Sequence, residues 1–262
     1  PSSRAAATWR ASRKSTRPEP LRLAEAVRTL SFPDASGSHA TMPHTSRNDP
    51  GFIHIFEPGS DPAAPPLLLL HGTGGTEHDL LRLGRAISPG SALLSPRGQV
   101  NEGGALRFFA RLAEGVFDPA EVAGRTHQLA DFIAAAAARY GFEPRKLIAA
   151  GFSNGANIAA SLLLLRPESL GGAILLRPMV VLEQTAPAGS LADRRVLVLN
   201  GSTDPLVPPD HPARLASLLR AGARAQDFRW AAVTGSVSHS LRYPCCVPCS
   251  IESFGSALGW PA

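Results

Sequence analysis

The sequence predicts an α/β fold in which helices cover both faces of a mostly parallel sheet. From Gly51 onward, short apolar runs alternate with amphipathic helical patterns, and this alternation is typical of strands joined through helices. Most of the runs are apolar without interruption, as strands buried on both faces of a sheet must be. At 262 residues the chain is long enough to bury a large core within one such domain.

Seven apolar runs are the candidate strands of this sheet. They are FIHIF (52–56), LLLL (67–70), ALLS (92–95), KLIAAGF (146–152), GAILL (172–176), VLVLN (196–200) and DFRWAAV (227–233). We find no internal repeat among them. The link between residues 176 and 196 is too short to hold a large cap domain.

The helical segments between these runs have recognisable ends. Thr76 and Asp79 resemble a capping pair at the start of one helix. The Asp-Pro pair at residues 118–119 supplies a cap and a first-turn proline, and Gly141 ends the same helix about six turns later. The Pro-Asp pair at residues 209–210 precedes a further helix.

Ser153 lies between two glycines where an apolar run gives way to a helical pattern. The segment reads LIAAGFSNGANIAAS, with Gly151 and Gly155 on either side of the serine. Gly-x-Ser-x-Gly at a strand-to-helix junction matches a nucleophile elbow, in which a sharp turn exposes the hydroxyl. An ordinary tight turn is the alternative. Because ligands bind beyond the carboxyl ends of parallel strands, Ser153 is a candidate nucleophile.

A serine nucleophile needs a base, and the base needs an orienting carboxylate. Asp204 follows the VLVLN run, so a strand end would bring it to the edge that carries Ser153; a turn or cap aspartate is the alternative. Only His211 and His239 follow the serine. We expect His211 to face solvent at a helix start, and His239 to lie on the loop after the last strand. The predicted triad is therefore Ser153, Asp204 and His239.

The same edge also supplies candidate donors for an oxyanion. The backbone N–H of Asn154 lies at the predicted helix start, where the helix dipole also favours negative charge. The second donor is expected from Thr73, within HGTGG (71–75) directly after the LLLL run. A plain glycine-rich turn or a phosphate loop is the alternative, but the GxxxxGK[ST] pattern is missing. His71 is expected to be a structural hydrogen-bonding residue and not a second base.

Taken together, five segments resemble the phospholipase/carboxylesterase family of compact α/β-hydrolases, kin of the acyl-protein thioesterases. They are LLLLHGTGG, ALRFFARLAEGVFD (105–118), GFSNGANIAASLL, LLRPMV (175–180) and LNGSTDPLVP. The resemblance runs from about Phe52 to Leu241. It implies an α/β-hydrolase fold without a large cap domain, and a hydrolase of carboxylic esters or thioesters.

The resemblance also implies roles for particular residues. Ser153, Asp204 and His239 match the triad positions of the family, and Thr73 and Asn154 match its oxyanion positions. Three further residues match family segments near the site and are candidates for substrate contact: Arg107, Phe108 and Met179. For Arg107 and Phe108 the alternative is packing and a surface salt bridge. Two departures concern the base: Ser238 precedes His239 where the family usually has glycine, and the chain lacks the family's amphipathic final helix.

Charge and composition bound the organisation of the chain. The formal net charge is +5 at pH 7, but most of the excess lies in residues 1–41, and the near-neutral remainder has no nucleic-acid-binding signature. That Arg- and Ser-rich leader is either an upstream or non-native extension or an organellar transit peptide. We expect residues 1–41 to lie outside the fold, residues 42–241 to form the α/β-hydrolase domain and residues 242–262 to form an atypical tail.

Other patterns bear on location and assembly. No run of about 18 apolar residues is present, so no membrane span is expected. The favoured location is the cytoplasm, with an organelle as the alternative if the leader is a transit peptide. A homodimer is possible.

All three cysteines lie in the tail, at Cys245, Cys246 and Cys249. The core therefore has no disulfide framework. Together with His239 the cysteines are residue types that bind zinc, but adjacent cysteines in a single cluster match known zinc spacings poorly. We expect neither a metal nor an organic cofactor.

The predicted activity is two-step acyl transfer to water from a small-molecule ester, a thioester or a lysophospholipid. Two alternatives remain open from the sequence. One is a non-catalytic α/β-hydrolase fold that binds a ligand or partner. The other is a dienelactone or C–C bond hydrolase that uses the same triad.

Overall fold

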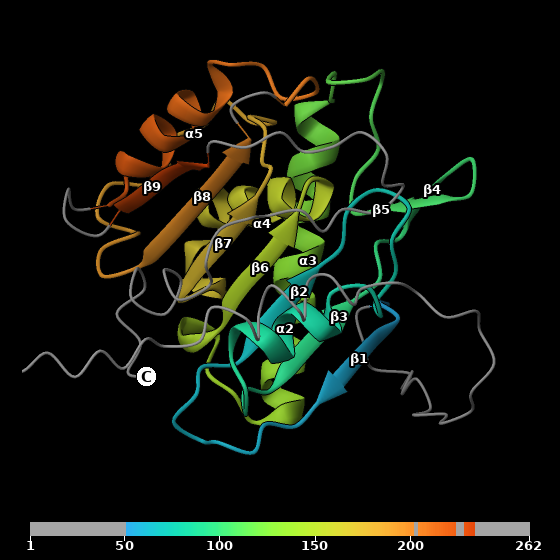
Figure 1. Ribbon diagram of the computed structural model, residues 1–262, viewed down its shortest axis with the longest axis vertical. Coiled ribbons are helices and arrows are strands. Elements are labelled where there is room, and N and C mark those ends of the chain that lie inside the picture. Colours follow the sequence, from blue (N-terminus) through green and yellow to red (C-terminus); the bar gives the residue numbers. More distant parts are fainter. Residues whose placement is uncertain (1–50, 202–203, 224–227, 234–262) are drawn as a thin grey trace, which may run out of the picture.

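The computed structural model describes residues 51–201, 204–223 and 228–233, and these form a seven-stranded sheet with helices on both faces (Figure 1). The strand order is β1-β3-β2-β6-β7-β8-β9. Only β1 runs antiparallel to its neighbour, β3. The strands are β1 (His54–Glu57), β2 (Leu67–Leu70), β3 (Leu93–Pro96), β6 (Ile148–Phe152), β7 (Gly172–Leu176), β8 (Arg195–Gly201) and β9 (Phe228–Val233). The predicted fold class is confirmed, and all seven predicted strands are present within two residues at each end.

Alternation along the strands divides the core into two layers. In β2, Leu68 and Leu70 belong to the larger cluster, whereas Leu67 and Leu69 belong to the smaller one, and all four are fully buried. Side chains of a strand point alternately to opposite faces, so an unbroken apolar run requires cover on both faces. The larger cluster lies under α3 (Pro119–Tyr140), α4 (Asn154–Leu165) and α5 (His211–Arg220), and the smaller one under α2 (Leu81–Ile87).

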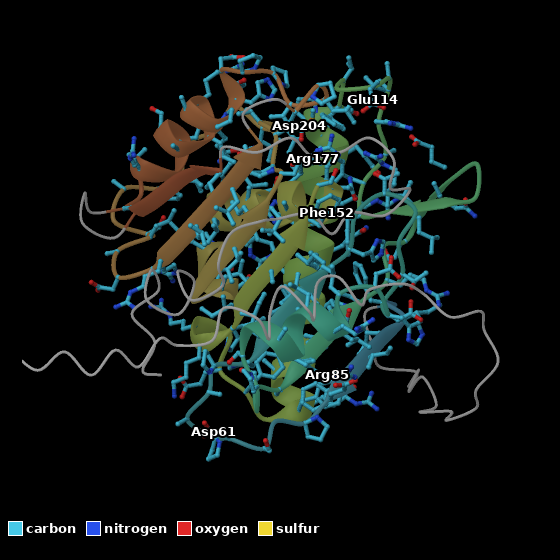
Figure 2. The ribbon with its side chains drawn as sticks, viewed as in Figure 1. Asp61, Arg85, Glu114, Phe152, Arg177 and Asp204 are labelled. Atoms are coloured by element: carbon cyan, nitrogen blue, oxygen red, sulfur yellow. The ribbon has the colours of Figure 1, made fainter. Side chains whose placement is uncertain are left out.

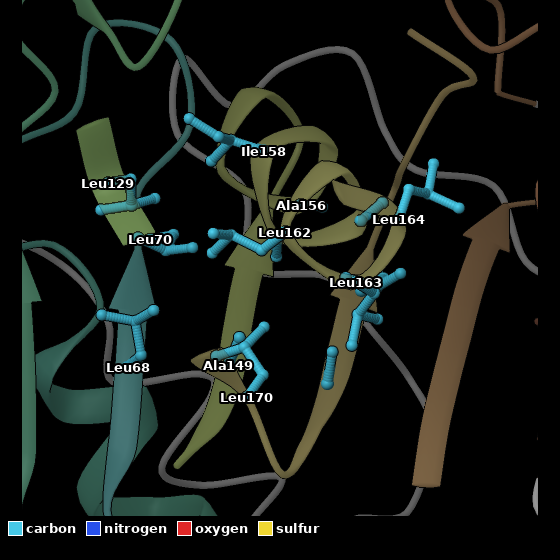
Figure 3. Close-up of a cluster of buried hydrophobic side chains, with 14 of the residues drawn as sticks. Leu68, Leu70, Leu129, Ala149, Ala156, Ile158, Leu162, Leu163, Leu164 and Leu170 are labelled. Carbon is cyan, nitrogen blue, oxygen red and sulfur yellow. The ribbon is translucent and has the colours of Figure 1, made fainter. Parts of the chain in front are cut away.

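Helix α4 lies in the centre of the larger layer. Residues 154–164 of this helix are all buried, because α4 packs on β6 and β7 on one side and on α3 on the other. Its buried leucines belong to one cluster with Leu68 and Leu70 of β2 (Figure 3). Two short 3-10 turns, η1 (Pro144–Lys146) and η2 (Pro167–Ser169), lead into β6 and β7.

The predicted helix ends are confirmed for α3 and corrected for α2. The Asp118 carboxylate accepts the N–H of Ala120 at 2.9 Å, and Gly141 ends α3 with a left-handed φ of 75°. In contrast, α2 begins at Leu81 and has no side-chain cap. The Asp79 carboxylate accepts a hydrogen bond from the Thr76 hydroxyl at 3.0 Å, so this pair closes a turn ahead of the helix.

A small hairpin was not predicted from the sequence. Strands β4 (Val100–Glu102) and β5 (Ala105–Arg107) pair antiparallel around Gly103 and Gly104, both with positive φ. Three-residue strands are too short to show a period of two. The hairpin projects beside the main sheet (Figure 1), and β5 ends at Arg107, which enters the candidate site.

The topology places a switch point at the carboxyl ends of β2 and β6. These strands are neighbours, but the chain continues from β2 to β3 on one side and from β6 to β7 on the other. Ligands of parallel α/β sheets bind at such a switch point. Residues 177–194, which link β7 to β8, contain no helix or strand, so no cap domain is inserted there. Within the described ranges, no helix is both long and apolar enough to cross a bilayer.

Candidate active site

Ser153 occupies a strained turn between β6 and α4. Its backbone has φ 50° and ψ −113°, a conformation that costs a non-glycine residue roughly 1–3 kcal/mol. Two hydrogen bonds hold it: the Ser153 N–H donates to the carbonyl of Leu176 at 2.9 Å, and the Ser153 carbonyl accepts the N–H of Asn157 at 2.9 Å. The half-buried serine therefore lies at the carboxyl edge of the sheet, on the strand-to-helix junction that the sequence predicted.

The two flanking glycines are required by main-chain contacts. A Cβ at Gly151 would lie 2.5 Å from the carbonyl oxygen of Gly155, and a Cβ at Gly155 would lie 2.0 Å from the carbonyl oxygen of Leu70. Backbone atoms cannot move aside as a flexible side chain can. The turn is thus tight enough to exclude any side chain at positions 151 and 155.

The glycine-rich loop after β2 lies against this turn. A Cβ at Gly72 would lie 2.7 Å from the Phe152 ring, and the N–H of Gly74 donates to the carbonyl of Leu106 at 2.8 Å. The first N–H groups of a helix have no acceptor within it. No hydrogen bond between described residues uses the N–H of Thr73 or of Asn154. Within the described ranges, neither group therefore has an acceptor.

The Asn154 side chain joins the turn to the segment that follows β5. Its Oδ1 accepts the N–H of Phe108 at 2.7 Å. The residue is 2% exposed, and its Nδ2 has no hydrogen-bond partner in the part of the chain that the structure describes. Phe108 is also buried, with its ring centroid 4.8 Å from that of His71.

Arg107 is a buried cation beside the glycine-rich loop, so its salt bridge, which is to Glu102, does not lie at the surface as the sequence-based alternative had it. The side chain is 4% exposed and donates to the Thr73 hydroxyl at 2.6 Å and to the Phe109 carbonyl at 3.1 Å. Burial lowers the pKa of Arg107, while the carboxylate of Glu102, 3.9 Å away, acts in the opposite direction. Arg107 therefore holds the loop that carries Thr73.

His71 has the structural role expected for it. Its Nε2 accepts the N–H of Gly98 at 2.9 Å, and its Nδ1 lies 2.7 Å from the carbonyl of Gly72, to which it donates. Burial lowers the pKa of His71 below its ordinary value, with smaller opposing effects from nearby hydrogen bonds and charges. The neutral ring thus ties the loop after β2 to the loop after β3.

Asp204 follows β8 and is paired with an arginine that the sequence reasoning missed. The Arg177 guanidinium forms a bidentate pair with the carboxylate, through Nε on Oδ2 and through Nη2 at 2.7 Å from Oδ1. The N–H of Leu206 donates to Oδ1 at 2.9 Å. The Asp204 side chain is 1% exposed. Burial alone would raise its pKa, but Arg177 and the backbone donors hold the pKa below its usual range.

Figure 2 shows Arg177 and Asp204 close together beyond the carboxyl ends of the strands, on the side of the sheet where Phe152 ends β6. A signal for Arg177 was present in the LLRPMV segment at the end of a predicted strand. However, its partner lies 27 residues further along the chain, and a pairing at that distance leaves no local pattern.

Of the two candidate bases, the structure describes His211. His239 lies outside the described residues. His211 does not face solvent as expected: it is half-buried, and its Nδ1 accepts the N–H of Val180 at 3.1 Å. Burial lowers the pKa of His211, against weaker effects from Asp210 and other charges. In a triad, Nδ1 must donate to a carboxylate, so the orientation of His211 does not suit the base.

The segment after β7 is attached to the helix that follows Ser153. The N–H of half-buried Met179 donates to the Asn157 side chain at 2.7 Å. Residues 180–184 and the start of α3 line a cavity of about 770 Å³. Ser153 does not line this cavity. No side chain in the described ranges joins a group of three or more His, Cys, Asp or Glu that could hold a metal ion, and the cysteines lie outside these ranges.

A mostly parallel sheet with helices on both faces, and a serine on a strained turn at its switch point, define an α/β-hydrolase. Comparison with known proteins agrees, since the phospholipase/carboxylesterase family matches residues 53–243. The chain therefore belongs to this family, and it is a hydrolase of the carboxylesterase type.

Individual relatives point the same way. The Bacillus subtilis (strain 168) protein MhqD, which is named as a hydrolase, is 46% identical over 177 residues, covering 68% of this chain and 87% of the relative. The crystal structure of the Bacillus cereus carboxylesterase is 36% identical, with a TM-score of 0.67, covering 79% of this chain and 93% of the other. A carboxylesterase from Mesorhizobium loti is 29% identical, with a TM-score of 0.68 and coverages of 82% and 98%.

Proposed function

We propose that this protein hydrolyses carboxylic esters of small molecules through an acyl-enzyme formed on Ser153. The observation that carries the proposal is the strained turn of Ser153, held between two glycines that admit no Cβ. Strain of this kind persists only where the surroundings impose it, and an exposed nucleophile is its common use at this position of a sheet.

In the first step, the Ser153 hydroxyl attacks the ester carbonyl while a histidine takes its proton. The N–H groups of Thr73 and Asn154 stabilise the negative charge that develops on the carbonyl oxygen. Two observations support these roles. The first turn of α4 leaves the Asn154 N–H without a helical acceptor, and the Arg107 side chain donates a hydrogen bond to the Thr73 hydroxyl. The alcohol leaves with the proton. In the second step the histidine takes a proton from water, which attacks the acyl-enzyme carbonyl, and the acid leaves as Ser153 regains its proton.

We assign the base to His239 and its orienting carboxylate to Asp204. The support for Asp204 is its burial beyond the end of β8, on the same edge of the sheet as Ser153. The support for His239 is its position after the last strand in the sequence, together with the unsuitable orientation of His211. Thioesters and lysophospholipids share the acyl carbonyl that this chemistry attacks, and we include them in the proposed substrate class.

Replacement of the nucleophile tests the proposal. Ser153→Ala should lower kcat for a p-nitrophenyl ester at least about 10⁴-fold, because no other group can form the acyl-enzyme. Ser161→Ala is the matched control, since this buried hydroxyl in the same helix donates only to the Asn157 carbonyl, at 3.0 Å.

A panel of acyl esters of increasing chain length, with the matching thioesters, would then define the substrate class. Full activity in Ser153→Ala would rule out the proposed mechanism. Binding of an ester without turnover by the unaltered protein would favour a non-catalytic binding protein instead.

A further inference from the structure

Arg177 contributes to the site through backbone as well as side chain. It directly follows β7, next to Leu176, whose carbonyl accepts the Ser153 N–H at 2.9 Å. Its own N–H donates to the carbonyl of Leu199 in β8 at 2.7 Å. Its φ of 58° is in the left-handed region, which a long side chain rarely adopts without compensation. The residue therefore lies between the strand end that supports Ser153 and the loop that carries Asp204.

The strained backbone aims the guanidinium at Asp204. Two donors of one planar group meet the two carboxylate oxygens, a geometry that fixes the rotation of the carboxylate as well as its position. The Arg177 side chain is 22% exposed and that of Asp204 is 1% exposed. Bidentate pairing with a nearly buried carboxylate is stronger and more directional than a surface ion pair.

Several donors hold the two oxygens of the Asp204 carboxylate. Oδ1 accepts from Arg177 and from the N–H of Leu206, Oδ2 accepts from Arg177, and the N–H of Val207 also faces the group. Because Arg177 is the donor that reaches both oxygens, it fixes the rotation of the carboxylate.

We propose that Arg177 is a positioning residue of the proposed triad, which fixes the orientation in which the Asp204 carboxylate is presented to the base. This inference rests on the proposed function, because it assigns Asp204 to the triad. Arg177 acts through Asp204 and need not touch the substrate.

The proposal has a consequence for pH dependence. Among the described residues, the charged and polar groups facing the Asp204 carboxylate are Arg177 and the N–H groups of Leu206 and Val207. A positive charge held beside the triad disfavours protonation of both the carboxylate and the adjacent imidazole. Without Arg177, both pKa values should rise, so the base stays protonated to a higher pH. The acid limb of the kcat/KM profile should therefore move upward.

The experiment compares Arg177→Met with Arg177→Lys and with Arg85→Met. Arg85 also forms a bidentate pair, with Glu57, but lies at the opposite end of the molecule (Figure 2). Arg177→Met should lower kcat/KM about 10- to 100-fold and raise the acid limb by about one pH unit. Arg177→Lys keeps the charge but loses the planar fork, so it should lower kcat/KM with little movement of the limb. Arg85→Met should change neither.

A second comparison separates this inference from the proposed function. In an Asp204→Asn background, Arg177→Met should change kcat/KM less than about twofold, because the two residues act through one group. If Ser153→Ala and Asp204→Asn strongly lower kcat/KM as expected but Arg177→Met keeps the kcat/KM and pH profile of the unaltered protein, the inference alone is wrong. Lower thermal stability with an unmoved pH profile would likewise reduce Arg177 to a structural role. If Arg177→Met does not fold, wild-type kcat/KM in Arg177→Lys would overturn the inference.

Discussion

Gly155 shows how strictly single residues are specified around the nucleophile. A methyl group there would overlap the carbonyl oxygens of Leu70 and His71, at 2.0 and 2.5 Å. By contrast, Gly124 lies exposed in the second turn of α3, and a Cβ there would meet nothing within 4 Å. Gly155 is therefore required at its position, whereas Gly124 can be replaced by a residue with a side chain.

Gly155→Ala should lower the free energy of unfolding by about 1–3 kcal/mol or more, because the backbone of β2 must shift to admit the methyl group. Gly124→Ala should raise it by about 0.5–1 kcal/mol, since alanine is the better helix former. Urea denaturation of both variants measures the two changes. An equal or greater stability for Gly155→Ala would contradict the tight turn described for Ser153.

Which residues the sequence could reveal depended on how local their partners are. The two glycines and Ser153 lie within five residues of one another, so a short motif was enough to predict the turn, although the contacts that require Gly155 come from Leu70 and His71. The roles of Arg177 and Arg107 depend on partners 27 and 34 residues away. Such partners become neighbours only when strands from different parts of the chain reach the same edge. The base assigned to His239 stays a prediction.

At the scale of elements, the ends of α3 are fixed by the Asp118 cap and by Gly141. Asp118→Ala removes the acceptor of the Ala120 N–H and should destabilise the protein by about 1 kcal/mol. Glu143→Ala is the control: it removes one exposed ion pair, with Lys146 at 3.2 Å, and should cost less than about 0.5 kcal/mol. Chemical denaturation compares them, and equal losses would mean that the cap contributes nothing beyond an ordinary surface contact.

The sequence predicted these elements well because their signals are strong. Fully apolar strands and a helix with both a cap and a terminal glycine each have one simple reading. The start of α2 was misjudged because Thr76 and Asp79 hydrogen-bond to each other, and the same residue types are used in caps and in turns. The β4–β5 hairpin was missed because its strands are three residues long.

At the scale of the whole molecule, stability should fall with acidity in two stages. The pKa of His71 and that of His211 lie below 6.5 in the folded protein, burial being the main cause. The unfolded chain therefore takes up protons first, and stability is lost as pH falls below about 6.5. The pKa values of Asp204 and Glu77 are also lowered, by Arg177 and Arg97 respectively, against the opposing effect of burial. Their contribution is present above about pH 4 and is lost below it.

Urea denaturation at a series of pH values between about 7.5 and 3 measures this course. In a His71→Asn variant, the decrease between about pH 7.5 and 5.5 should be smaller than in the unaltered protein, because one of the titrating groups is gone. A free energy of unfolding that stays level across that interval would contradict the buried, neutral state of His71.

The order of the strands has a consequence for the nascent chain. Strand β2 is apolar on both faces, yet one of its two neighbours, β6, comes from much later in the sequence. While the ribosome is still making the intervening segment, that edge of β2 has no partner, and unpaired apolar edges invite association between chains. The candidate site also forms at this seam, with Thr73 from the earlier half and Ser153 from the later one. Enzymatic activity would therefore appear only after the later strands have been synthesised and β6 has paired with β2.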